Sequence, residues 1–132
     1  MQPVSANSSS FRNGALFGML VSLTLWATVF GGADSGPLNQ LLRTPGLDKV
    51  GHVVLYGGLT ALAIAGTGDR RVLRFVPLWP SVFFTLSLLD EFRQRTVPGR
   101  DFSRDDMIAN LLGVSLGWVA GRIWQRLERR AG

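Results

Sequence analysis

The sequence predicts an all-α membrane protein, built as a bundle of four transmembrane helices. Two observations indicate this class. Of the 132 residues, 46% are hydrophobic and only 17% are charged, and the hydrophobic residues gather in four segments separated by polar connections. Four tryptophans and eight phenylalanines fit a protein in contact with lipid and its interfaces. The chain has no cysteine, which excludes a disulfide framework and thiolate chemistry.

The first apolar segment, residues 14–33, contains no charged residue and has the length of about 20 residues that a helix needs to cross the hydrocarbon core. A signal peptide is an alternative, because Arg12 precedes the segment and the small residues 31–33 suit cleavage. We favour a membrane span, because the segment is longer than a signal-peptide core and further apolar segments follow. Residues 1–12 are polar and serine-rich, and we expect a short disordered arm there.

A second span is predicted over residues 50–66, after a connection rich in proline and glycine. Asp48, His52 and Tyr56 follow one another at intervals of four residues at its start. A helix places residues with this spacing on one face. The sequence therefore predicts a polar face at the beginning of the second helix.

A third span is predicted over residues 72–89, and its Pro80 is expected to bend or delay the helix. The uninterrupted part, from Ser81 onward, is short for a crossing. Asp90 and Glu91 follow directly. We therefore expect these two carboxylates at the membrane boundary, where an unpaired charge is costly.

The fourth span is predicted over residues 107–124, with Gly113, Gly117 and Gly121 at intervals of four. Such a stripe of small residues lets a second helix approach closely. Residues 126–132 form a basic tail, which we interpret as a membrane-surface anchor. Although the net charge is +5, we expect no nucleic-acid partner, because the arginines lie between apolar segments. The membrane domain is expected to cover residues 13–125.

The connection over residues 90–110 carries five of the nine acidic residues and four of the fourteen basic ones. Ser103 and Asp106 are spaced as a capping box that opens the fourth helix. Four crossings place this connection on the same side of the membrane as Asp48. Eight of the basic residues fall on the side of the termini and six on the other, so both termini are predicted to be cytoplasmic.

The polar residues on that shared side form one candidate functional cluster. Ionisable residues at membrane depth are functional candidates when they face the interior of a bundle. The candidates are Asp48, Lys49, His52, Tyr56, Asp90, Glu91, Gln94, Arg100, Asp106 and Asn110.

Two blocks of this cluster carry a resemblance to a known family. The first is D-K-x-x-H-x-x-x-Y at residues 48–56. The second is E-x-x-Q at 91–94, P-G-R at 98–100 and D-x-x-x-N-x-x-G-x-x-x-G at 106–117. In these blocks the chain resembles the VanZ-like family of small polytopic bacterial membrane proteins, whose namesake is associated with resistance to the glycopeptide teicoplanin. The resemblance implies the bacterial inner membrane and a role in the cell envelope, without assigning a reaction.

One hypothesis is that the cluster binds or processes a polar lipid headgroup or a cell-envelope precursor at the membrane face. Arg100 suits a phosphate or carboxylate through its planar guanidinium. His52 can act as acid or base with Asp48 orienting it, and Glu91 or Asp106 can hold a hard divalent cation. The sequence contains no complete catalytic signature, so it assigns neither a catalytic residue, nor a metal, nor a cofactor.

Two other hypotheses remain open. The charges can instead form a structural network that pins the loop onto the bundle, in a membrane scaffold or modulator of envelope proteins. A transporter or channel is a weaker hypothesis, because four spans in 132 residues would need a homo-oligomer to line a pathway.

Overall fold

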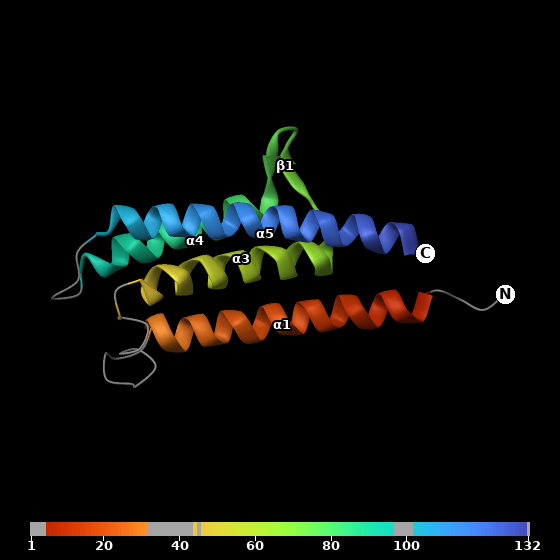
Figure 1. Cartoon of the computed structure of the whole chain (residues 1–132), viewed down its shortest axis with the longest axis horizontal. Helices are drawn as coiled ribbons and strands as arrows, with labels where there is room; N and C mark the ends of the chain where they lie inside the picture. The colour runs from red at the N-terminus through yellow and green to blue at the C-terminus, as the bar shows by residue number, and fades with distance from the viewer. Residues whose placement is uncertain (1–4, 32–43, 45, 97–101, 132) are drawn as a thin grey trace.

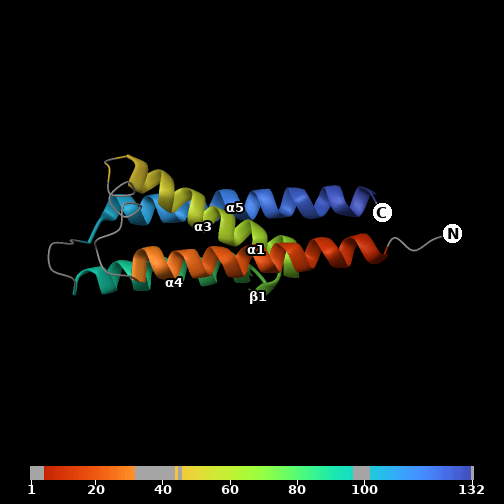
Figure 2. The same cartoon turned by 90° about the horizontal axis from the view of Figure 1, so that it is seen from below.

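Four helices and one small hairpin make up the described part of the chain. The computed structural model describes residues 5–31, 44, 46–96 and 102–131. The elements are α1 (Ser5–Gly31), α3 (Leu47–Thr67), β1 (Arg71–Leu73), β2 (Val76–Pro77), α4 (Leu78–Gln94) and α5 (Arg104–Ala131). The helices lie side by side along the long axis of the molecule, and both termini lie at the same end (Figure 1 and Figure 2).

The bundle agrees in part with the predicted membrane architecture. Among the described residues, two helices are long and apolar enough to cross a membrane, over Leu47–Thr67 and Arg104–Arg130. Each contains the whole of a segment predicted as a span, residues 50–66 and 107–124. The chain is therefore mainly helical, with a small β-hairpin that an all-α prediction did not include.

The contact between α3 and α5 brings two backbones together. A Cβ atom built on Gly113 would lie 2.6 Å from the carbonyl oxygen of Val53, and one built on Gly117 would collide with the backbone of Gly57. These glycines belong to the stripe predicted to permit close packing. Because the backbones meet directly, the two helices hold each other in a fixed register.

The core lies between α3, α4 and α5, with α1 packed on its outer side. Its buried members are Tyr56, Leu59, Ala63, Phe83 and Val114. Partly buried hydrophobic residues of α1 and α4 pack against this group, namely Met19, Leu23 and Trp79, together with Leu55 of α3. The core therefore joins all four helices.

The first and last helices are longer than the predicted spans. Helix α1 begins at Ser5, so residues 5–12, expected as a disordered arm, are helical. The ring of Phe11 stacks on Trp124 of α5 with the ring centroids 4.8 Å apart, which gives the first turns of α1 a packing partner. Helix α5 continues to Ala131 through the segment predicted as a basic tail. Its last turn carries arginines, and their positive charge suits a helix C-terminus.

The start of the predicted third span is wrong, because residues 71–77 form an antiparallel hairpin of β1 and β2. Pro77 has an extended backbone (φ −68°, ψ 133°) and precedes the first residue of α4. Pro80 lies in the first turn of α4, where proline is tolerated because no intrahelical N–H bond is needed there. Pro80 thus falls at the beginning of the helix and does not bend its interior.

Candidate functional site

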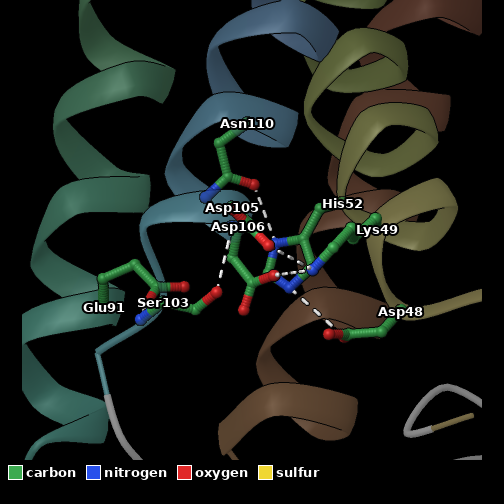
Figure 3. Close-up of polar contacts among 8 residues, drawn as sticks. All are labelled: Asp48, Lys49, His52, Glu91, Ser103, Asp105, Asp106 and Asn110. Carbon is green, nitrogen blue, oxygen red and sulfur yellow. Dashed lines mark hydrogen bonds and ion pairs between the residues drawn. The ribbon is translucent and has the colours of Figure 1, made fainter. Parts of the chain in front are cut away.

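The candidate site lies at the end of the bundle opposite the two termini (Figure 1). Three helix ends meet there: the starts of α3 and α5 and the last turns of α4 (Figure 3). The antiparallel order of the helices brings together sequence segments that are more than forty residues apart. The shared side predicted for these segments is therefore a shared end of the bundle.

The first turns of α3 present the predicted polar face. His52 is 4% exposed, and its Nε2 lies 3.5 Å from Oδ1 of Asp48, one turn earlier. The ring of Tyr56, one turn later, lies 6.3 Å from the His52 ring between centroids. The spacing of four residues thus aligns a carboxylate, an imidazole and a phenol from the helix end to the core.

The first turns of α5 supply the partners of that face. The Asp106 N–H donates to Oγ of Ser103 at 3.2 Å, as the predicted cap requires. Nδ1 of His52 and Oδ1 of Asn110 lie 2.7 Å apart, and both side chains are buried. Lys49 Nζ donates to Oδ1 of Asp106 at 3.4 Å. Asp106 and Asn110 therefore join α5 to α3 on one face.

Lys49 also reaches Asp105, whose carboxylate is 3.7 Å from Nζ. The side chain of Asp105 is 72% exposed, and that of Asp106 is 13% exposed. The two neighbouring acids thus differ in environment. Asp106 faces the site, and Asp105 lies at its solvated edge.

Glu91 approaches the site from α4 and is 1% exposed. The Ser103 N–H donates to its Oε2 at 3.5 Å. In a capping box this N–H would donate to the acid of the same helix, which is Asp106 in α5. Here Glu91 of α4 accepts the hydrogen bond instead. This leaves the Asp106 carboxylate free to face α3.

The remaining predicted members divide into two groups. Asp90 is buried and forms an ion pair with Arg93 of its own helix at 3.1 Å. Arg100 and the side chain of Gln94 lie outside the described residues. Sequence reasoning missed the link from Ser103 to Glu91, because it joins two segments that only the fold brings together.

Three donors at the site are close enough to share a metal ion. Ligand atoms of Asp48, His52 and Asp106 lie within 4.8 Å of one another. Glu91, which the sequence offered as a cation ligand beside Asp106, is not among these three. The geometry thus adds Asp48 and the imidazole to Asp106.

An open groove of about 400 Å³ lies between α3 and α5 beside these charges. Its walls are mainly apolar and carry charged residues at one end. The lining residues are Lys49, Val50, Val53, Asp105, Ile108, Ala109 and Leu112. Such a groove can hold an apolar chain while a polar group reaches the charged residues.

A second polar arrangement, which sequence reasoning missed, lies near the other end of the bundle. Asp69 accepts a hydrogen bond from the Trp118 indole at 3.1 Å and pairs with Arg122 at 3.4 Å. The signal in the sequence was a single acid within a short basic connection. These contacts tie the connection after α3 to α5, far from the candidate site.

Comparison with known proteins gives a family. A family model described as VanZ/LLP1 matches residues 2–125. This range contains both motif blocks and all the residues of the candidate cluster. No curated protein and no solved structure matches the sequence.

Proposed function

This chain belongs to the VanZ/LLP1 family, and from that premise we propose that it binds a lipid or cell-envelope precursor by its polar headgroup at the membrane face. The family and the two apolar helices indicate a membrane protein. We further propose that all four helices cross the bacterial inner membrane, with both termini in the cytoplasm. The candidate site then lies at the outer face.

The observation that carries this proposal is the meeting of a charged helix end with an apolar groove. Lys49 and Asp105 line the groove and also belong to the charged end. Val50 and Leu112 belong to its apolar wall. A ligand that suits both parts is amphipathic, with a charged head and a hydrocarbon chain. A water-soluble metabolite would leave the apolar wall unused.

The basic residues are proposed to bind the headgroup. Lys49 is half-exposed and can shift from Asp105 to an incoming anion at little cost, because an exposed ion pair contributes about 0–1 kcal/mol. Arg100 is proposed to supply a bidentate contact to phosphate or carboxylate. Together they favour an anionic headgroup.

The experiment that tests this proposal is mass spectrometry of the lipids that copurify with the protein in a mild detergent. Val50→Trp fills the groove, whereas Val54→Trp adds the same side chain at a position of α3 that is 66% exposed and outside the groove. We expect one class of anionic lipid to be enriched with the wild type and Val54→Trp, and to be lost with Val50→Trp and Arg100→Ala. An identical lipid profile for all four proteins would contradict the proposal.

The structural alternative also has an observation in its favour, because the His52–Asn110 and Ser103–Glu91 hydrogen bonds join three helices. A scaffold predicts that conservative changes at the site lower the melting temperature, and that function falls only in proportion to the protein lost. A binding site predicts that Glu91→Gln and Arg100→Lys remain folded but lose function. Melting in detergent and an envelope-stress phenotype, measured on the same variants, separate the two.

A further inference from the structure

The three clustered donors come from two different helices and point toward one another. Asp48 and His52 lie on α3 and Asp106 lies on α5, and Figure 3 shows their polar atoms converging beside Lys49. Their ligand atoms fall within 4.8 Å of one another. An ion placed among them would therefore bridge the two helices that the glycine stripe already holds in register.

The hydrogen bond to Asn110 decides which nitrogen of His52 carries the proton. Oδ1 of Asn110 can only accept a hydrogen bond, so His52 Nδ1, at 2.7 Å, carries the proton. In the neutral ring, Nε2 then has a lone pair, and it is this atom that faces Asp48 at 3.5 Å. A histidine that ligates a metal typically has this arrangement, in which the second ring nitrogen donates to an oxygen that fixes the tautomer.

Among the described residues at the site, the acidic side chains outnumber the basic ones. Asp90 pairs with Arg93, and Lys49 is shared by Asp105 and Asp106. Within the described ranges, no lysine or arginine forms an ion pair with Asp48 or Glu91.

The buried Glu91 provides a second observation. Its Oε1 is buried and has no hydrogen-bond partner among the residues that the structure describes. The carboxylate is turned toward Ser103, on the side from which Asp106 projects (Figure 3). A buried oxygen without a partner is costly, and a cation on the neighbouring ligands would offset the negative charge there.

We propose that Asp48, His52 and Asp106 bind one divalent first-row transition-metal cation, with Zn²⁺ the preferred ion. One imidazole nitrogen and two carboxylate oxygens are a ligand set for Zn²⁺, whereas Mg²⁺ and Ca²⁺ prefer oxygen alone. The inference deepens the proposed function, and the role that it gives the metal, which is to bind the headgroup, rests on that function. Three protein ligands leave a coordination position open, to which an anionic headgroup can bind.

The test is a calorimetric titration of Zn²⁺ into tag-free protein that has been treated with a chelator. We expect one Zn²⁺ per chain, and an affinity that falls at least about tenfold in Asp48→Asn and in Asp106→Asn. Asp105→Asn is the matched comparison, because it makes the same change at the solvated edge, and it should lower the affinity much less than either of the other two changes. Lys49→Met should bind more tightly, because it removes a competing cation from Asp106.

The single histidine of the chain permits a direct measurement at the ligand. In ¹⁵N NMR spectra of the imidazole, Zn²⁺ should shift the Nε2 resonance, while Nδ1 keeps its proton. Mg²⁺ and Ca²⁺ at tenfold higher concentration should not reproduce the shift. This readout needs no variant, so it remains decisive if a substitution impairs folding.

The inference is overturned if the wild type binds Zn²⁺ no more tightly than Asp48→Asn, or if the Nε2 resonance does not respond. Equal losses in Asp105→Asn and Asp106→Asn would also overturn it, because they would indicate a diffuse acidic surface. Its failure is distinct from that of the proposed function. Lipids that copurify without Zn²⁺ binding refute the metal alone, and Zn²⁺ binding with no enriched lipid refutes the headgroup proposal alone.

Discussion

Replacing Gly113 by alanine tests the backbone contact on which the site depends. The new Cβ would lie 2.6 Å from the Val53 carbonyl oxygen, whereas ordinary van der Waals contact begins at 3.4 Å, so α3 and α5 must separate by about 0.8 Å. A gap of roughly 0.5–1 Å forfeits about a quarter to a half of each dispersion contact. The overpacking is expected to cost about 1–3 kcal/mol.

Gly58→Ala is the matched control, because a Cβ on that helical glycine meets nothing within 4 Å. Alanine is favoured over glycine in a helix by about 1 kcal/mol, and both variants share that gain. The difference between them therefore isolates the clash. We expect Gly58→Ala to be as stable as the wild type or more stable, and Gly113→Ala to be less stable than both.

The assay is the free energy of unfolding, measured by circular dichroism during titration with SDS in mixed micelles. A second effect is expected at the site, because Asn110 lies one turn before Gly113. A separation of about 0.8 Å would stretch the 2.7 Å contact between His52 and Asn110 to the limit of a hydrogen bond. If Gly113→Ala proves as stable as Gly58→Ala, the close approach of α3 and α5 is refuted.

Three further predictions concern other parts of the molecule. The Oε1 of Glu91 is buried and has no hydrogen-bond partner among the described residues, and a buried charged group without a partner is costly. Glu91→Gln should therefore raise the melting temperature of the protein above that of the wild type in chelator at pH 8, and a lower melting temperature would contradict this. A cysteine at Thr96, in a chain without native cysteine, should react with an impermeant reagent in intact cells; labelling only after lysis would reverse the proposed orientation. Phe11→Ala should remove the stack on Trp124, worth about 0.5–1.5 kcal/mol, and speed proteolysis at the start of α1, whereas Phe17→Ala, at a position 68% exposed, should not.

Periodic patterns in the sequence predicted much of this structure. The spacing of four residues aligned Asp48, His52 and Tyr56, and the same spacing placed the glycines of α5 against α3. Both patterns are local properties of a helix, so one segment at a time is enough to detect them. The sequence also placed the starts of α3 and α5 at the same end, because it predicted four helices that alternate in direction.

The features that were missed depend on contacts between segments. The helical start of α1 packs on Trp124 through Phe11, a contact between residues more than a hundred positions apart, whereas composition alone indicated disorder. The hairpin before α4 was predicted as the start of an apolar span. Hydropathy alone does not distinguish exposed strand residues such as Val72 and Leu73 from residues of a membrane helix. The role of Glu91 at the Ser103 cap required both segments in space. Pairing across segments is the information that a single sequence lacks.

The brevity of α4 has a consequence for the surrounding bilayer. Its 17 residues extend about 25 Å at 1.5 Å per residue, whereas the hydrocarbon core is about 30 Å thick. If α4 crosses the membrane as proposed, hydrophobic mismatch should thin the bilayer locally on this flank. Reconstitution into lipids with progressively longer acyl chains should then lower the stability of the protein, and an unchanged stability would argue against a crossing by α4. Local thinning would bring the headgroups of neighbouring lipids closer to the level of Glu91, so that the polar groups of the membrane would lie next to the site.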